Sequence, residues 1–270
     1  MNETKLKEYR EVRISSNIVL NDCYFILEIA ETTLLPQPGQ FYLLKPIGES
    51  SSILHIPVSI YNVKDSRLQF MVKIIGPGTR RLSELVKGDR LKLLGPLGNG
   101  FPLVEKQKIL LISGGIGYAP LYLLKEELLR KENLVTWLHG GKIGSDIFPA
   151  DLACTESGEI GLKGLVTDLL YKALETGHSS EDTADYLDGK RQSFDHIYCC
   201  GPKGMMREVS RIVSRYEIPL SVSLEEYMAC GMGVCLGCVV KIQGKSADIE
   251  YKTVCKDGPV FSAAEVLWDE

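Results

Sequence analysis

A short loop rich in cysteine constrains this chain more than any other feature of its sequence. The stretch from Tyr227 to Lys241 reads YMACGMGVCLGCVVK and places three cysteines and three glycines within nine residues. A disulfide knot, a zinc knuckle or an iron–sulfur cluster would each explain such a loop. A chain of 270 residues can bury a sufficient hydrophobic core without disulfide bonds. Its eight cysteines are poor candidates for disulfides in a reducing compartment. The loop therefore indicates metal ligation or redox chemistry.

Composition restricts the compartment and the partners. The first residues, MNETKLKEYREVRISSN, are charged from the third position and lack the apolar core of a signal peptide. No apolar run approaches the roughly 20 residues of a membrane span. We therefore expect a cytoplasmic protein with no membrane partner. A net charge of -4 with no basic stripe argues against nucleic acid as a partner.

The spacing of the cysteines discriminates among metal sites. The pattern is Cys230-x4-Cys235-x2-Cys238, followed after sixteen residues by Cys255, which is the three-plus-one spacing of plant-type [2Fe–2S] ligation. The intervening glycines let the backbone fold tightly and turn its amides toward sulfur. Structural zinc remains an alternative, although its ligands usually come as two close pairs. The spacing thus favours a [2Fe–2S] cluster held by these four cysteines.

The rest of the chain shows two different patterns of apolar residues. Residues 9 to about 100 carry short apolar segments such as YFILEIA and LQFMVKII between turn signals such as PQPGQ, a pattern typical of a small antiparallel barrel. From Lys108, an apolar strand in KILLISGG precedes a helical repeat in APLYLLKEELLRKEN, and further such pairs predict an α/β domain with a parallel sheet. We expect the polar run from Thr176 to Ser193 to be an exposed insertion in that domain.

Two loops of the predicted α/β domain are candidates for nucleotide binding. Gly114, Gly115 and Gly117 follow an apolar strand and open a helix, where a diphosphate can approach the backbone and the helix N-terminus. Cys200 and Gly201 also stand between a strand and a helix. Ligands of open α/β sheets bind at the carboxyl ends of strands, so the two loops are expected to frame one site. Neither loop is specific alone, because many such loops are merely tight turns.

Motifs along the chain resemble those of one family. A P-x-S strand, GPGT, GPLGNGF, GGIGYAPL, CGPKGM and SLEEYMACGMGVCLGC with VCKDGPVF are similar to the electron-transfer subunit of the NAD-dependent dihydroorotate dehydrogenase, a branch of the ferredoxin-reductase-like flavoproteins. The resemblance covers nearly the whole chain. It implies a FAD-binding β barrel at residues 1–103, a NAD-binding α/β domain with a parallel sheet at 104–219 and a small [2Fe–2S] subdomain at 220–270.

The resemblance also implies which residues contact the cofactors. The flavin contacts would be Ile56, Pro57, Val58, Ser59, Met71, Val72, Lys73, Gly78 and Thr79. The NAD dinucleotide would face Gly114, Gly115 and Gly117, with Cys200 and Gly201 near the nicotinamide.

One position departs from the family pattern. Where the family has Arg-Pro-x-Ser, this chain has Ile56-Pro57-Val58-Ser59 and so lacks the cation expected beside the flavin. We expect FAD to bind less tightly here than in relatives with arginine, unless Lys73 or His55 supplies that cation.

The implied function is electron transfer. The chain would be an NADH-linked oxidoreductase subunit that passes electrons between a partner and NAD through [2Fe–2S] and FAD. The implied partner is the FMN-containing dihydroorotate dehydrogenase catalytic subunit of pyrimidine biosynthesis, in a heterotetramer. The sequence offers no catalytic acid–base arrangement to nominate, which suits a protein whose cofactors carry the chemistry. The stretch from His139 to Lys142 has one lysine and no arginine for a 2′-phosphate, which together with the resemblance favours NADH over NADPH.

Two other functions remain open from the sequence. One is an NAD(P)H:acceptor reductase subunit of another redox complex, with the same cofactors and a different partner. The other is a zinc-stabilised interaction module without flavin, an alternative made worth naming by Ile56.

Overall fold

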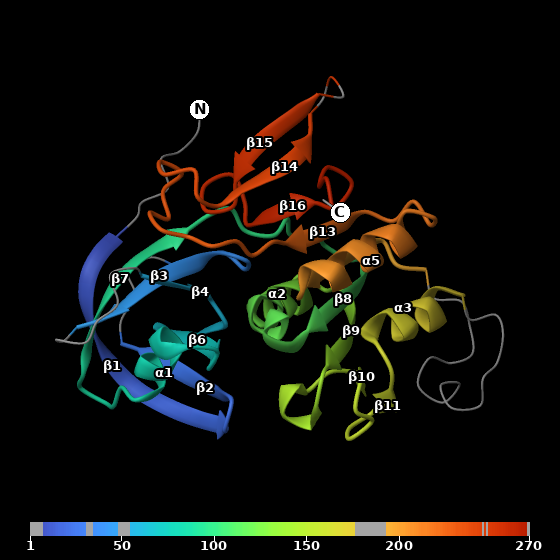
Figure 1. The fold of residues 1–270 in the computed structure, drawn as a ribbon. Coiled ribbons are helices and arrows are strands. Elements are labelled where there is room, and N and C mark those ends of the chain that lie inside the picture. Colours follow the sequence, from blue (N-terminus) through green and yellow to red (C-terminus); the bar gives the residue numbers. More distant parts are fainter. Residues whose placement is uncertain are drawn as a thin grey trace.

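Three structural parts follow one another along the chain (Figure 1). The computed structural model describes residues 8–30, 35–47, 55–175, 193–244, 246 and 248–268. The predicted insertion from Thr176 to Ser193 therefore lies, apart from its last residue, outside the described residues. None of the helices in the described ranges is long and apolar enough to cross a membrane.

The first part is an antiparallel sheet whose strand order is β4-β3-β7-β1-β2-β6-β5. Its strands are β1 (Glu8–Asn21), β2 (Tyr24–Ile29), β3 (Phe41–Pro46), β4 (Ile56–Ser59), β5 (Asn62–Lys64), β6 (Arg67–Lys73) and β7 (Arg90–Leu97), and the short helix α1 (Pro77–Ser83) follows β6. The sheet curls around a core that includes Tyr42, Leu44, Phe70 and Leu93. The predicted antiparallel barrel is confirmed as a curled half-barrel, with β4 and β5 at the ends of the sheet order among the described strands.

The second part is a mostly parallel sheet whose order is β11-β10-β9-β8-β12-β13-β16. Its elements are β8 (Lys108–Gly114), η1 (Gly115–Gly117), α2 (Tyr118–Arg130), β9 (Leu134–Gly141), η2 (Gly144–Asp146), β10 (Leu152–Thr155), β11 (Leu162–Lys163), α3 (Val166–Glu175), β12 (His196–Cys200), α5 (Lys203–Val213), β13 (Leu220–Ser223) and the antiparallel β16 (Val260–Ser262).

The apolar run in KILLISG forms a strand because both of its faces are covered, as is usual in parallel sheets. Ile109 and Leu111 pack with α2, whereas Leu110 and Ile112 pack with α3 and α5. The chain moves from β8 to β9 on one side and later returns to β12 on the other side. The strand order thus reverses between β8 and β12, which is where open α/β sheets bind their ligands.

The third part carries the cysteine loop between β13 and the hairpin of β14 (Val239–Gln243) and β15 (Ile249–Thr253). In Figure 1 these orange and red elements extend across one end of both sheets. The loop packs on the barrel, since a Cβ on Gly231 would lie 2.6 Å from a methyl carbon of Leu43. Asn99, just after β7, donates its side-chain amide to the carbonyl of Asp257 at 2.9 Å. These contacts fix the loop against the barrel.

Candidate functional site

A pocket of about 650 Å³ opens between the barrel, the start of α2 and the segment that follows β13. This volume is within the range of small-molecule and cofactor sites. The pocket is lined by all but one of the predicted flavin contacts, namely Ile56, Pro57, Val58, Ser59, Met71, Val72, Lys73 and Thr79. The remaining one, Gly78, lies directly behind the wall, where an added Cβ would come within 3.0 Å of the Cδ1 of Ile56.

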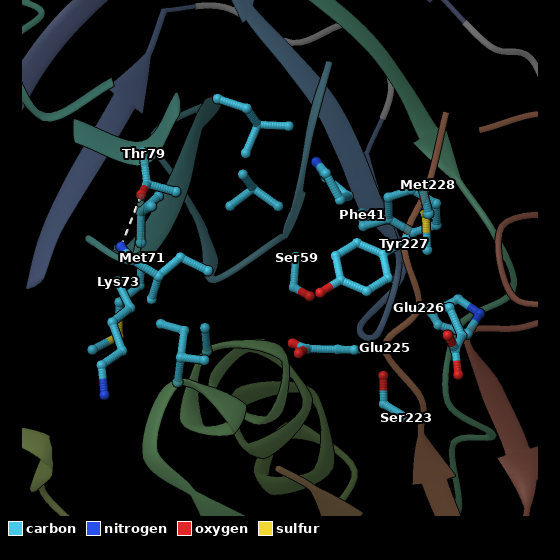
Figure 2. A pocket seen from close by; sticks show the side chains of 18 of the residues that line it. Phe41, Ser59, Met71, Lys73, Thr79, Ser223, Glu225, Glu226, Tyr227 and Met228 are labelled. Atoms are coloured by element: carbon cyan, nitrogen blue, oxygen red, sulfur yellow. Dashed lines mark hydrogen bonds between the residues drawn. The ribbon is translucent and has the colours of Figure 1, made fainter. Parts of the chain in front are cut away.

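The opposite wall is the segment from Ser223 to Met228, which links β13 to the cysteine loop. Figure 2 shows the side chains of Ser59, Glu225 and Tyr227 directed toward one another across the pocket. Sequence reasoning assigned no contact to this segment. The only signal was its position, because SLEEYM directly precedes the first cysteine of the motif.

Glu225 is an acidic residue of this wall. Its side chain is exposed at the pocket wall, yet the neighbouring protein partly desolvates the carboxyl and so raises its pKa. The wall therefore offers a carboxyl group that is more readily protonated than an ordinary glutamate.

Lys73 is held by an ion pair to the second domain. Its Nζ lies 2.7 Å from Oδ1 of Asp146, and the hydroxyl of Tyr24 donates to the same oxygen at 2.6 Å. Burial alone would raise the pKa of Asp146, but the hydrogen bonds from Lys73 and Tyr24 outweigh it and lower the pKa. The charge of Lys73 is thus balanced by Asp146, so Lys73 is a poor substitute for the missing family arginine.

Thr79 lies in the first turn of α1 and caps the start of that helix. Its hydroxyl oxygen accepts a hydrogen bond from the backbone N–H of Ile75 at 2.9 Å, the dashed line in Figure 2. It also accepts one from the backbone N–H of Gly76 at 3.2 Å. The hydroxyl also donates to the carbonyl of Gly76 at 3.1 Å. These bonds hold the turn before α1 at the edge of the pocket.

The two predicted nucleotide loops touch each other. A Cβ on Gly117 would lie 2.2 Å from the carbonyl oxygen of Cys200, and a Cβ on Gly201 would lie 3.0 Å from the backbone nitrogen of Gly114. The first distance is too short for any side chain, and the second would force a shift of the neighbouring loop. Gly117 and Gly201 are therefore needed for contact between the loops, which for Gly117 is a physical reason different from the approach of a diphosphate. Gly115 is the more open position, with only the Tyr24 hydroxyl within 4 Å of an added Cβ.

Cys200 lies behind the pocket wall. Its thiol is buried and is 3.6 Å from the carbonyl oxygen of Ser223, a pocket-lining residue, to which it donates. Burial raises the pKa of the thiol well above its usual value. Its neighbour Cys199 is fully buried in the core.

His139, near the end of β9, is enclosed by hydrogen-bonding partners within the protein core. The ring of His139 is fully buried, with Nδ1 2.8 Å from the Ser113 hydroxyl and Nε2 2.9 Å from the Asp146 carbonyl. Burial lowers the pKa of this imidazole. His139 therefore stabilises the strand ends beneath the site.

The cysteine loop brings its sulfurs together as two pairs. The backbone N–H of Cys235 donates to Sγ of Cys230 at 3.5 Å, and the backbone N–H of Cys255 donates to Sγ of Cys238 at 3.4 Å. The side chains interact within the same two pairs. Among the described residues, no three ligand-type side chains converge on a single point. Two thiolate pairs are the donor set that a two-iron cluster requires.

Backbone amides surround these sulfurs. Gly233 donates to Sγ of Cys255 at 3.1 Å and Met232 to Sγ of Cys230 at 3.4 Å. Hydrogen bonds from the amides of Cys235 and Met232 lower the pKa of the Cys230 thiol to about 6, whereas burial raises that of Cys255 to about 12. The loop thus supplies the N–H donors that stabilise thiolate ligands.

Family models match two parts of the chain. The iron–sulfur cluster binding domain of dihydroorotate dehydrogenase B matches residues 225–267, and the oxidoreductase NAD-binding domain matches residues 111–211. The first match contains all four cysteines of the motif. The second begins in β8 and contains both glycine loops.

Curated relatives match over most of the chain's length. The electron transfer subunit of dihydroorotate dehydrogenase B (NAD(+)) from Clostridium acetobutylicum is 33% identical over 272 residues, which cover 98% of this chain and 99% of that protein. The protein of the same name from Bacillus cereus is 35% identical over 256 residues, covering 88% of this chain and 91% of its own length.

Solved structures share the fold. A structure of the NADH-dependent reduced ferredoxin–NADP oxidoreductase superposes with a TM-score of 0.79 at 27% identity, covering 99% of this chain and 92% of that chain. A ferredoxin NADP⁺ reductase from Neisseria gonorrhoeae with bound FAD and NADP has a TM-score of 0.63 at 16% identity, covering 80% and 93% of the two chains. The second likeness shows the fold alone.

Proposed function

Since the chain belongs to the family of electron transfer subunits of NAD(+)-dependent dihydroorotate dehydrogenase B, we propose that its partner is an FMN-containing dihydroorotate dehydrogenase catalytic subunit. The two would form a heterotetramer that serves pyrimidine biosynthesis. The chain itself is the electron-transfer component, an oxidoreductase subunit with FAD, NAD and [2Fe–2S] as its cofactors. When bound, these groups supply hydride exchange at NAD, one- or two-electron exchange at the flavin and one-electron exchange at the cluster.

The observation that carries this proposal is the continuity of the three candidate sites. The segment from Ser223 to Met228 forms one wall of the flavin pocket and leads directly to Cys230. Ile116 and Ala119, beside the glycine loop, line the opposite part of the same pocket. A flavin held there would therefore lie between the nucleotide loops and the cysteine loop, as a two-electron to one-electron relay requires.

The residues present fit the cofactors. Cys230, Cys235, Cys238 and Cys255 would hold the cluster, and the backbone amides of the loop would stabilise its sulfur ligands. The pocket of about 650 Å³ would hold the flavin. Gly114, Gly115, Gly117, Cys200 and Gly201 would frame the NAD. The domain boundaries at residues 103 and 219 remain part of this proposal. Strands β13 and β16 follow residue 219 in the sequence, but they pair within the sheet of the NAD-binding domain.

Exposed apolar side chains around the cysteine loop support a docking surface for the partner. Met232, Val234 and Leu236 lie between the ligand cysteines in the sequence and are 48%, 78% and 63% exposed. Exposed apolar groups clustered in one loop are typical of protein interaction sites. A partner that docks on these three side chains would lie against the cluster rather than against the flavin.

The proposal is tested by reconstitution with the partner. The isolated chain should reduce artificial electron acceptors with NADH and leave dihydroorotate unchanged until the FMN-containing subunit is added. Val234→Asp should lower the partner-dependent reaction and leave NADH-dependent acceptor reduction intact. Val86→Asp, at a position that is 62% exposed on the barrel, is the matched control and should change neither reaction. Dihydroorotate oxidation by the isolated chain would contradict the proposal.

A second candidate is an NAD(P)H:acceptor reductase subunit of another redox complex. It is favoured by the superposition on the NADH-dependent reduced ferredoxin–NADP oxidoreductase over nearly the whole chain. Co-purification from the native cell discriminates between the two candidates, because each predicts a different bound partner.

A further inference from the structure

The fourth cysteine of the motif is distant in sequence from the other three, so its position depends on contacts outside the cysteine loop. Cys255 lies in the Cys255 turn (residues 254–258), which directly follows β15. The carboxylate of Asp257 in this turn accepts hydrogen bonds from the backbone N–H of Thr253 at 2.7 Å and from its hydroxyl at 2.9 Å. The turn is thus closed by its own side chains, and it buries its cysteine.

An asparagine of the barrel holds this turn from outside. The side-chain amide of Asn99 donates to the carbonyl oxygens of Asp257 at 2.9 Å and of Lys256 at 3.2 Å. The backbone N–H of Asn99 donates to the carbonyl oxygen of Gly258 at 2.6 Å. One residue of the barrel therefore satisfies three consecutive carbonyls, the first of which belongs to the residue after Cys255.

Both sides of this clamp adjoin the flavin pocket. Pro259, the residue after the Cys255 turn, lines the pocket, and its carbonyl accepts a hydrogen bond from the backbone N–H of Leu224 on the same wall at 2.9 Å. On the barrel side, the last residue of β7 pairs with Phe41, which also lines the pocket. Asn99 follows the end of β7 by two residues. The clamp therefore lies where the pocket wall meets the turn that carries the fourth cysteine.

The other contacts of the turn do not replace this clamp. The backbone N–H of Val254 donates to the carbonyl of Cys238 at 2.9 Å, which ties the turn to the cysteine loop and not to the barrel. Among the residues that the structure describes, Asn99 is the one barrel residue whose side chain bonds to the turn. Loss of its amide would therefore loosen the turn on the barrel side while its contact with the cysteine loop persists.

We propose that Asn99 is a positioning residue for electron transfer between the flavin and the cluster, because it fixes the fourth cluster ligand against the wall of the flavin pocket. The inference rests on the proposed function, which assigns the flavin to the pocket and the cluster to the four cysteines. NADH supplies two electrons as a hydride, of which one passes to the cluster and the other stays on the flavin. Asn99 holds the separation that this one electron crosses, as residues that orient metal ligands do.

Two substitutions test the amide of Asn99, which is an exposed residue whose loss opens no cavity. Asn99→Asp keeps the size of the side chain but has no N–H to donate, and Asn99→Ala removes the side chain beyond Cβ. Asn17→Ala is the matched control. The amide of Asn17 on β1 also donates to backbone carbonyls, of Leu85 at 2.8 Å and of Ser83 at 2.9 Å, but these lie at the end of α1.

The test is anaerobic stopped flow of the purified full chain, loaded with its cofactors, against NADH. Flavin reduction is followed by visible absorption and cluster reduction by freeze-quench EPR. Both Asn99 variants should reduce the flavin at the wild-type rate and the cluster about tenfold or more slowly, and they should lose iron to a chelator about tenfold faster. Asn17→Ala should match the wild type in all three rates, although its melting temperature falls as that of Asn99→Ala does.

The outcomes separate this inference from the proposed function. If both Asn99 variants reduce the cluster at the wild-type rate, the positioning role is wrong, while the flavin and cluster assignments stand. Equal slowing of flavin and cluster reduction, or the same slowing in Asn17→Ala, would also overturn it, because either result indicates general damage to the fold. If NADH reduces no flavin or no cluster in the wild-type chain, the proposed function fails and this inference fails with it.

Discussion

The ammonium of Lys73 lies 2.7 Å from a carboxylate oxygen of Asp146, and this ion pair ties the wall of the flavin pocket to the NAD-binding domain. Tyr24 donates to the same carboxylate, so two side chains of the barrel converge on one side chain of the second domain. The relative position of flavin and nucleotide therefore depends in part on Asp146.

Asp146→Asn should lower the free energy of unfolding by about 1.5–3 kcal/mol, the range for hydrogen bonds to charged groups. Because the folded-state pKa of Asp146 is lowered, its contribution is fully present above the ordinary carboxyl pKa and is lost as the pH falls through the lowered value. Urea unfolding of both chains at several pH values measures this. The difference between them should shrink in acid, and a difference independent of pH would contradict the role of the ion pair.

Gly117→Ala should separate the two nucleotide loops. The new methyl group would meet the Cys200 carbonyl at 2.2 Å, and overpacking against backbone costs about 1–3 kcal/mol. We expect a lower melting temperature and a raised KM for NADH in acceptor reduction. Gly204→Ala in α5 is the control, because nothing lies within 4 Å of its Cβ position. Equal behaviour of the two variants would show that the loop contact is unimportant.

Cys235→Ser should abolish or severely reduce cluster incorporation while the barrel stays folded. Cys235 is an exposed member of the Cys230 pair, so its loss removes a ligand without opening a cavity. Iron and acid-labile sulfide per chain, with an EPR spectrum after reduction, provide the readout. Cys23→Ser, which changes a partly exposed cysteine outside the motif, should retain the full complement. Full iron and sulfide in the Cys235 variant would refute the ligand assignment.

NADH should be preferred over NADPH. The end of β9 offers His139, which is fully buried, and Lys142 as the one cation of the stretch considered for a 2′-phosphate. Steady-state acceptor reduction with each donor, compared as kcat/KM, tests the preference. A higher value with NADPH would count against both the nucleotide assignment and the proposed partner.

The fold class could be predicted, and the cysteine ligands could be proposed, because their signals are local. The spacing of Cys230, Cys235 and Cys238 is set by the cluster geometry, and the apolar run of β8 is readable from a few residues. The role of Gly117 could not be predicted in the same way, since the atom that excludes its side chain belongs to Cys200 on another loop.

The pocket was hardest to predict where its residues contact residues that are distant in the sequence. Lys73 was a candidate for the missing cation until the fold placed Asp146 beside it, a partner 73 residues away. Glu225 and Tyr227 had no local pattern that marks a pocket wall. They line the pocket because β13 ends beside β12 and directs the chain across the barrel.

The most direct test of electron transfer through this chain is an anaerobic titration of the purified protein with NADH, followed by visible absorption. The account predicts a coloured protein whose flavin and iron–sulfur absorbance both bleach on addition of NADH, because the nucleotide loops, the flavin pocket and the cysteine loop adjoin one another. A colourless chain, or one whose absorbance does not change with NADH, would contradict it.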